Sequence, residues 1–179
     1  MGEVLMKQVV LYFPGQGAQQ LGMLADLAEQ YPVIQETFEQ ASRAIDQDLW
    51  ALVQNGPAEE LNLTYNTQPI LVAASAAIWN VIQQEVGSDI QVVAAAGHSV
   101  GEYSALYAAG ILSLQDAVRL VKTRGELMDN AVPAGEGGMA AILGLDSDQI
   151  QAVCAEASSA GVVEPANYNA PGQIVIAGT

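Results

Sequence analysis

The sequence predicts an α/β protein in two parts, a larger body over residues 1–132 and a smaller unit over residues 133–179. In the body, two short apolar runs each end at a glycine-rich turn and lead into helical sequence, which is typical of a parallel sheet. A hinge rich in proline and glycine follows, and after it the pattern becomes strand, helix, strand, strand. Hydrophobic residues make up 51% of the 179 residues and charged residues 14%, which supports a packed core.

The body begins with a strand over residues 8–13 that stops at a glycine loop, residues 14–17. Helical sequence follows over 23–55 and is broken near Pro32, a residue that suits the first turn of a second helix. Residues 68–86 are apolar nearly all round, so we expect a long buried helix there. The remaining body elements are a strand over 91–96, a helix that ends at Gly110, and a helix over 113–131 that opens with a capping-box-like Ser113–Asp116.

The smaller unit is predicted to contain a strand over 139–143, a helix over 146–158, and strands over 162–168 and 173–177. A β-α-β-β-α-β unit of the ferredoxin-like type would need one more helix and one more strand. We therefore expect the chain to be truncated within a ferredoxin-like small subdomain.

Charge and cysteine content exclude several classes of protein. Lys and Arg number 5 against 20 Asp and Glu, a net charge of −15, which leaves no basic surface for nucleic acid or for an anionic membrane. The single cysteine, Cys154, cannot form an internal disulfide, and no Cys/His spacing of a zinc site is present. The sequence has no signal-peptide core and no apolar run long enough to cross a bilayer, so we expect a cytoplasmic protein without a metal.

Residues 97–101 read Gly-His-Ser-Val-Gly and match the G-x-S-x-G pattern of a nucleophile turn. The motif follows a predicted strand and opens a predicted helix, so Ser99 is the candidate nucleophile; the alternative is an ordinary serine in a glycine-rich turn. We expect glycine at both flanking positions because a Cβ would collide where strand and helix close on each other. His98 is the only histidine, but adjacent side chains at a strand end diverge. We expect His98 to be buried, hydrogen-bonded and structural, which leaves the general base unassigned.

The first glycine loop, residues 14–19, also follows a strand. It lacks the third glycine of a dinucleotide fingerprint and the Lys-Ser/Thr pair of a phosphate loop. We therefore expect it to supply a backbone N–H to an oxyanion beside Ser99, the alternative being a plain tight turn.

Arg124 stands where the helix over 113–131 should bury an apolar side chain. An inward guanidinium needs a partner, because an unpaired buried charge is costly. Three interpretations remain open: an ion pair with a protein carboxylate such as Glu102, a snorkelling side chain, and a bidentate clamp on a substrate carboxylate. The expected stripe otherwise consists of Ala117, Leu120, Val121, Leu127, Met128 and Ala131, whereas Arg119 and Lys122 are expected on a solvated face.

Seven stretches of the sequence together resemble the malonyl-CoA:acyl carrier protein transacylase family of bacterial fatty-acid synthesis. They are collinear with the family's motifs and span essentially the whole chain, which corresponds to the N-terminal portion of the family. They read FPGQGAQQLGM (13–23), GPAEELN (56–62), TQPIL (67–71), AGHSVGEYSAL (96–106), DAVRLVKTRGELM (116–128), GGMAAILGL (137–145) and NYNAPGQIVIAG (167–178).

The resemblance implies a hydrolase-like parallel-sheet subdomain joined to a ferredoxin-like small subdomain. It also implies a ping-pong acyl transfer without a cofactor, with malonyl-CoA as the substrate and an acyl carrier protein as the partner. Ser99 matches the nucleophile that carries the malonyl ester, and Arg124 matches the residue that binds the malonyl carboxylate. The family's catalytic histidine and a further active-site glutamine lie beyond Thr179.

Further site residues are implied by the resemblance alone. The backbone N–H groups of Gln16 and Val100 match the oxyanion hole. His98 matches a motif histidine that is not the general base, and Asn167 matches a stretch that lines the cleft.

Two other classes remain open at this point. A serine esterase or thioesterase shares the serine turn but does not require an inward arginine, and a non-catalytic fragment fits the missing base. A net charge of −15 disfavours contact with an acidic carrier protein, so we expect that contact on a local basic patch or beyond Thr179. We also expect this fragment to be inactive alone and prone to self-association.

Overall fold

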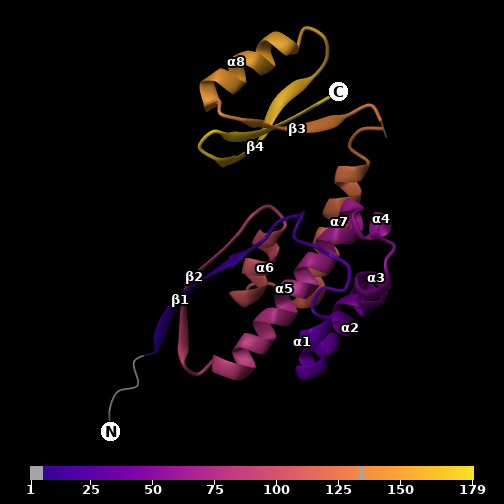
Figure 1. Ribbon diagram of the computed structural model, residues 1–179, viewed down its shortest axis with the longest axis vertical. Helices are drawn as coiled ribbons and strands as arrows, with labels where there is room; N and C mark the ends of the chain where they lie inside the picture. The colour runs from indigo at the N-terminus through magenta and orange to yellow at the C-terminus, as the bar shows by residue number, and fades with distance from the viewer. Residues whose placement is uncertain (1–5, 134) are drawn as a thin grey trace. The chain divides into compact units, whose positions relative to one another are not determined.

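The computed structural model describes residues 6–133 and 135–179 (Figure 1). It divides into two compact units, the first ending at Leu127 and the second spanning Met128–Thr179, so the division falls in the last turn of helix α7 (Leu114–Asp129). Each unit has its own sheet and its own hydrophobic core, and the predicted α/β class is confirmed. Within the described residues, no helix has both the length and the apolar character needed to cross a membrane.

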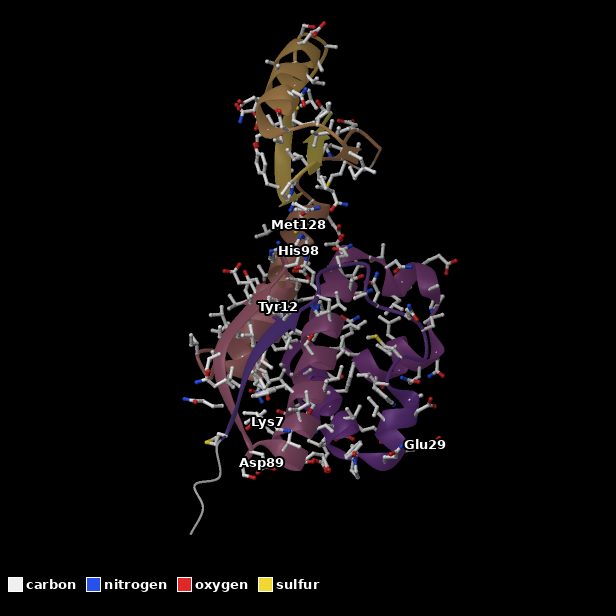
Figure 2. The ribbon with its side chains drawn as sticks, turned by 60° about the vertical axis from the view of Figure 1, so that its left-hand side comes forward. Lys7, Tyr12, Glu29, Asp89, His98 and Met128 are labelled. Atoms are coloured by element: carbon white, nitrogen blue, oxygen red, sulfur yellow. The ribbon has the colours of Figure 1, made fainter. Side chains whose placement is uncertain are left out.

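The sheet of the first unit joins two segments that are far apart in sequence. β1 (Lys7–Phe13) pairs in parallel with β2 (Ile90–Gly97), and Phe13 lies opposite Gly97. Both strands therefore end at the same edge of the sheet, and in Figure 2 His98 marks this edge. A parallel pair needs a long crossover connection. The helices that supply it are α1 (Ala25–Gln30), α2 (Val33–Ile45), α3 (Leu49–Asn55), α4 (Ala58–Leu61) and α5 (Thr64–Val86).

Helix α5 forms the centre of the first unit's core, and its residues 66–77 are all buried. It begins at Thr64, before the expected start at 68, because polar residues of its first turn are buried with partners and not solvated. Thr67 Oγ1, for example, donates to the carbonyl of Leu61 at 2.6 Å. Helix α2 packs against α5, and its Phe38 meets the ring of Trp50 edge-on at 5.0 Å between centroids.

The helical run over 23–55 is interrupted twice. The break at Pro32 was expected, and the structure adds one between α2 and α3. There Asp46 adopts a left-handed conformation with φ 51°, and Asp48 caps α3 by accepting from the N–H of Ala51 at 2.9 Å. Short helix α4 was not predicted either, and it follows the Gly56-Pro57 pair directly.

Helices α6 and α7 follow β2. α6 (Gly101–Ala108) begins directly after the serine turn and ends before Gly110, as the glycine predicts. α7 begins at Leu114, where Ser113 Oγ accepts from the N–H of Asp116 at 3.0 Å. The predicted start of this helix is therefore confirmed.

The second unit contains the predicted order of strand, helix, strand and strand. These elements are β3 (Gly138–Leu143), α8 (Ser147–Ala157), β4 (Val163–Ala170) and β5 (Gln173–Gly178). The antiparallel sheet has the order β3-β5-β4, and α8 contributes to a core formed by Ile150, Cys154 and Ile174. α8 starts with a capping box in which Asp146 and Gln149 each accept from the other's backbone N–H at 2.9 Å.

Candidate active site

Ser99 lies on a sharp turn between β2 and α6. It has φ 53°, a left-handed conformation that residues with a side chain seldom adopt. A Cβ on Gly97 would run into the backbone of Gly101, and a Cβ on Gly101 would come within 2.5 Å of the Phe13 carbonyl oxygen. The glycines of the motif are therefore required by close approach of backbone to backbone, which confirms the expectation from the sequence.

The first glycine loop lies against this turn. The N–H of His98 donates to the carbonyl of Phe13 at 3.1 Å, which extends the parallel pairing past the end of β2. A Cβ on Gly15 would lie 2.6 Å from His98 Nδ1 and 2.9 Å from the His98 carbonyl oxygen. The loop that carries Gln16 is thus held next to Ser99, because both loops continue from paired strands.

The glycine loop is also fixed from its far side. Gly17 has φ 108°, and its N–H donates to Gln19 Oε1 at 2.8 Å. The amide of Gln19 in turn donates to Asn62 Oδ1 at 2.7 Å. These contacts order the backbone around Gln16, whose own side chain is exposed.

The amino end of α6 follows Ser99 immediately. The N–H of Gly101 donates to the His98 carbonyl at 2.9 Å, and the N–H of Glu102 donates to the Ser99 carbonyl at 3.1 Å. Val100, which lies between Ser99 and Gly101, is 1% exposed and anchors the turn in the core. The first N–H groups of a helix carry a partial positive charge, which favours an anion at this position.

Arg124 of α7 makes hydrogen bonds to two neutral side chains. Its Nη1 donates to Gln68 Oε1 at 2.7 Å and its Nη2 donates to Ser99 Oγ at 2.9 Å. Among the ion pairs of residues 6–133 and 135–179, none involves Arg124 or Glu102. The half-buried guanidinium therefore keeps an unneutralised positive charge beside the serine hydroxyl.

A glycine brings α7 close to α5 at this point. A Cβ on Gly125 would lie 2.5 Å from the Cα of Tyr65, so the two helices touch backbone to backbone. Because Gly125 follows Arg124 directly, this contact sets the guanidinium opposite Gln68, in the second turn of α5.

The face that α7 buries differs from the expected stripe. Leu120, Leu127 and Met128 are 48%, 68% and 45% exposed, so their assignment to the core was wrong. The buried face is rotated around the helix, and Arg124 lies at its edge. The α7 residues that are buried are Leu114, Ala117, Val118, Val121 and Gly125.

His98 also differs from the expectation, because its side chain is exposed and not buried. The turn directs it over Gly15, which has no side chain to cover it. The hydrogen bond that the structure shows to Ser99 Oγ comes from Arg124 Nη2, at 2.9 Å.

Gln68 and Asn167 differ in how they relate to the sequence analysis. Gln68 was not singled out from the sequence. The signal available there was a polar residue at the start of a helix predicted to be buried, and the structure shows Gln68 fully buried. Asn167 belongs to the second unit, where it is half-buried on β4 opposite Val175. It remains a candidate through the family resemblance alone.

Other features of the described residues do not add to this site. An apolar pocket of about 360 Å³ lies between β1 and α5, and its lining includes Leu11 and Ile78 but neither Ser99 nor Arg124. The described part of the chain contains no group of three or more His, Cys, Asp or Glu placed to hold a metal ion.

A serine on a strand-to-helix turn, at the amino end of a helix and with a cation beside it, is the arrangement of an acyl-transfer enzyme that uses a serine nucleophile. Comparison with known proteins agrees. The chain belongs to the acyl transferase domain family, whose profile matches residues 10–179.

Individual relatives carry a more specific name. The chain is 55% identical over 173 residues to the malonyl CoA-acyl carrier protein transacylase of Salmonella typhimurium, covering 97% of this chain and 55% of the relative. It resembles the solved malonyl-CoA:acyl carrier protein transacylase of Xanthomonas oryzae pv. oryzae with a TM-score of 0.90 and 51% identity, over 97% of this chain and 55% of that one. The chain thus spans about half the length of these relatives.

A third match concerns a complex. The chain is also similar to a solved complex of a malonyl-transacylase with its type II PKS acyl-carrier protein, with a TM-score of 0.88 and 52% identity. This match covers 96% of the present chain and 55% of the solved one.

Proposed function

We propose that this chain carries the nucleophile of a malonyltransferase, which moves a malonyl group from coenzyme A to the phosphopantetheine thiol of an acyl carrier protein. The observation that carries the proposal is the pair of hydrogen bonds from Arg124, one to Gln68 and one to Ser99 Oγ. An esterase needs the serine turn but has no use for a cation at the nucleophile.

The chemical structure of a malonyl thioester explains the value of that cation. Its free carboxylate is separated from the thioester carbonyl by a single methylene. When Ser99 Oγ attacks this carbonyl, the carboxylate must lie within a few ångströms of Oγ, which is the region that Arg124 reaches. Charge-assisted bonds to a carboxylate are stronger than the bond to a neutral hydroxyl, so Nη2 would exchange Ser99 for substrate. Gln68 would keep Nη1 in place during the exchange.

The first half of the reaction forms an ester on Ser99. The hydroxyl oxygen bonds to the carbonyl carbon, the carbon–sulfur bond breaks, and coenzyme A leaves as its thiol after taking up a proton. Ser99 gives its own proton to a general base, which the family resemblance places in a histidine outside this chain. We assign the oxyanion to the backbone N–H groups of Gln16 and Val100, because their two loops meet at the carboxyl edge of the sheet.

The second half of the reaction regenerates the free hydroxyl of Ser99. The sulfur of the phosphopantetheine thiol attacks the ester carbonyl, the bond to Ser99 Oγ breaks, and Oγ recovers a proton while the thiol loses its own.

The acyl carrier protein as partner is supported by the complex that one relative forms. His98 and Asn167 are proposed to line the substrate path, and no cofactor is needed. We also place the enzyme in the cytoplasm. The proposed subdomain boundary at 132/133 lies five residues after the division into compact units at Leu127 and Met128.

The test is the site of acylation in a chimaera that joins residues 1–179 to the part of the Salmonella typhimurium relative outside the alignment. Incubation with malonyl-CoA and digestion should place the malonyl mass on the peptide that contains Ser99. Ser99→Ala should abolish the label, while Ser88→Ala, at an exposed serine outside the site, should keep it. Release of free malonate at the rate of label turnover, with none passed to a carrier thiol, would favour an esterase or thioesterase instead.

A further inference from the structure

Lys122 occupies an unusual place on α7. The sequence places it on a solvated face, but its side chain is only 20% exposed. The ammonium nitrogen lies 4.4 Å from the centroid of the Tyr65 ring and donates to Gln47 Oε1 at 3.2 Å. Its acidic neighbour Glu126 is farther away, at 3.8 Å, and is itself 52% exposed. Lys122 is therefore held chiefly by an aromatic face and an amide.

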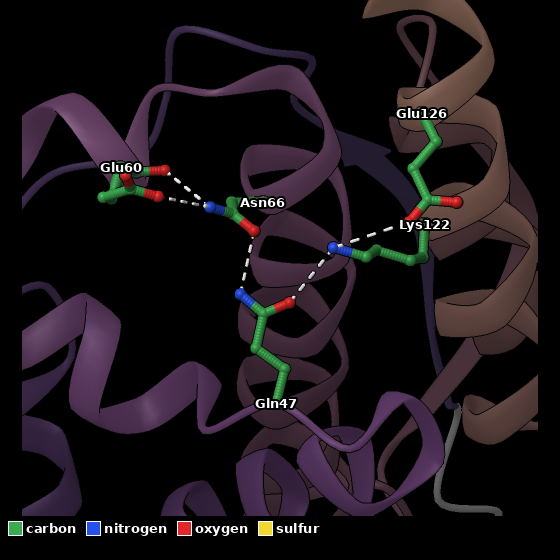
Figure 3. Close-up of polar contacts among 5 residues, drawn as sticks. All are labelled: Gln47, Glu60, Asn66, Lys122 and Glu126. Carbon is green, nitrogen blue, oxygen red and sulfur yellow. Dashed lines mark hydrogen bonds and ion pairs between the residues drawn. The ribbon is translucent and has the colours of Figure 1, made fainter.

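Figure 3 shows that this amide continues into the first turn of α5. Gln47 Nε2 donates to Asn66 Oδ1 at 2.8 Å, and Asn66 Nδ2 donates to the carbonyl of Glu60 at 2.9 Å. Asn66 is 2% exposed, so its amide depends on these partners. The network thus links Lys122 of α7 to two residues of α5, Tyr65 directly and Asn66 through Gln47.

The same two helix segments carry the site. Arg124 lies two residues after Lys122, and Gln68 lies three residues after Tyr65. Residues two apart on a helix point in different directions. Lys122 and Arg124 therefore contact the amino end of α5 on different sides, Lys122 at Tyr65 and Arg124 at Gln68. Gly125, the residue after Arg124, touches the backbone of Tyr65. Any shift of α7 along α5 would change the distance from Arg124 to both Gln68 and Ser99.

We propose that Lys122 is a positioning residue for Arg124: it fixes α7 on the first turn of α5, and thereby sets how strongly the enzyme prefers a carboxylated acyl group. The inference rests on the proposed function. The contact between the guanidinium and a substrate carboxylate depends on where the guanidinium lies, and misplacement by about 1 Å can cost on the order of 10²-fold in rate. Lys122 itself touches no reacting atom.

The test compares kcat/KM for malonyl-CoA and acetyl-CoA in the chimaera. Lys122→Met keeps the length and apolar stem of the side chain but removes the charge. We expect the malonyl-to-acetyl ratio to fall about 10-fold, a fraction of the loss quoted for a 1 Å misplacement, with the acetyl value nearly unchanged. Lys122→Arg keeps a cation over Tyr65 and a donor for Gln47, and should restore the ratio to within about 2-fold of the parent. Glu126→Gln is the matched control on the same helix and should leave the ratio unchanged.

A second comparison separates positioning from a general effect on folding. In the Arg124→Ala background Lys122→Met should not lower the ratio further, because Lys122 acts through Arg124. Equal losses for both substrates, or an unchanged ratio in a folded Lys122→Met protein, would overturn the inference while leaving the proposed function intact. If Lys122→Met does not fold, Lys122→Gln takes its place with the same expectation. A parent chimaera without preference for malonyl-CoA would reject the proposed function, and this inference with it.

Discussion

The guanidinium of Arg124 donates to the hydroxyl oxygen of Ser99 at 2.9 Å, although the two residues come from a helix and a turn that are 25 positions apart. The contact exists because β2 ends at Gly97 and α7 is drawn to α5 by Gly125. A fixed cation at a nucleophile distinguishes acyl groups that end in a carboxylate from those that do not.

Removing the cation should therefore change selectivity. We expect Arg124→Ala in the chimaera to lower kcat/KM for malonyl-CoA by at least about 10²-fold, through loss of the charge-assisted contact with the substrate's carboxylate, and to affect acetyl-CoA far less. Steady-state kinetics with both substrates measures this. Arg119→Ala is the control, since Arg119 lies on the same helix, is 59% exposed, and donates to the carbonyl of Ala44 away from the site. Parallel loss for both substrates would mean that Arg124 is only structural.

Gln68 should control the same selectivity from the other side. Gln68→Leu removes the acceptor for Nη1 and leaves a half-buried donor unsatisfied, which costs about 1–3 kcal/mol, so malonyl transfer should fall roughly 10-fold or more. Gln68→Glu is the more informative change, because its carboxylate would pair with Arg124 and compete with the substrate's carboxylate. We expect malonyl transfer to fall further in Gln68→Glu than in Gln68→Leu, at comparable thermal stability. The reverse order would argue against Arg124 as the carboxylate site.

Gly97 should be intolerant of a side chain. A Cβ there meets the backbone of Gly101 and Glu102, which cannot move without breaking the turn, so Gly97→Ala should destabilise the first unit by about 1–3 kcal/mol or more. Thermal unfolding followed by circular dichroism gives the change. At Gly138 the position of an added Cβ is open, so Gly138→Ala should stay within about 0.5 kcal/mol. If the two variants melt alike, backbone crowding is not the reason for glycine at 97.

The serine turn was predictable because its requirements are local: a strand, a crowded pair of glycines and a helix follow one another in sequence. Gln68 was not, because its role depends on Arg124, which is 56 residues away. The buried face of α7 was misplaced because apolar residues occur on more than one side of this helix, and periodicity alone could not choose between Leu120 and Val118. Lys122 was expected on the surface because the sequence of α7 does not show its aromatic partner, Tyr65, which lies on α5.

Residues 1–179 alone should transfer malonyl groups slowly. The chain spans 55% of the length of its Salmonella typhimurium relative, and Ser99 Oγ accepts from a guanidinium, which has donors and no acceptor and so cannot serve as the base. Loss of the base in serine hydrolases leaves a residual rate of roughly 10³–10⁴-fold over water. Leu127, Met139 and Leu143 are 68%, 63% and 71% exposed, so we also expect the isolated chain to self-associate.

Complementation tests this expectation directly. Adding the part of the relative that lies outside the alignment, as a separate polypeptide, should raise the transfer rate and shift the isolated chain from oligomers to a one-to-one complex in size-exclusion chromatography with light scattering. Ser99→Ala should form the same complex without activity, because the serine contributes chemistry and little packing. Transfer by residues 1–179 alone at the rate of the chimaera would show that a base for Ser99 is already present in this chain, and His98→Ala would then identify whether that base is the exposed neighbour of the nucleophile.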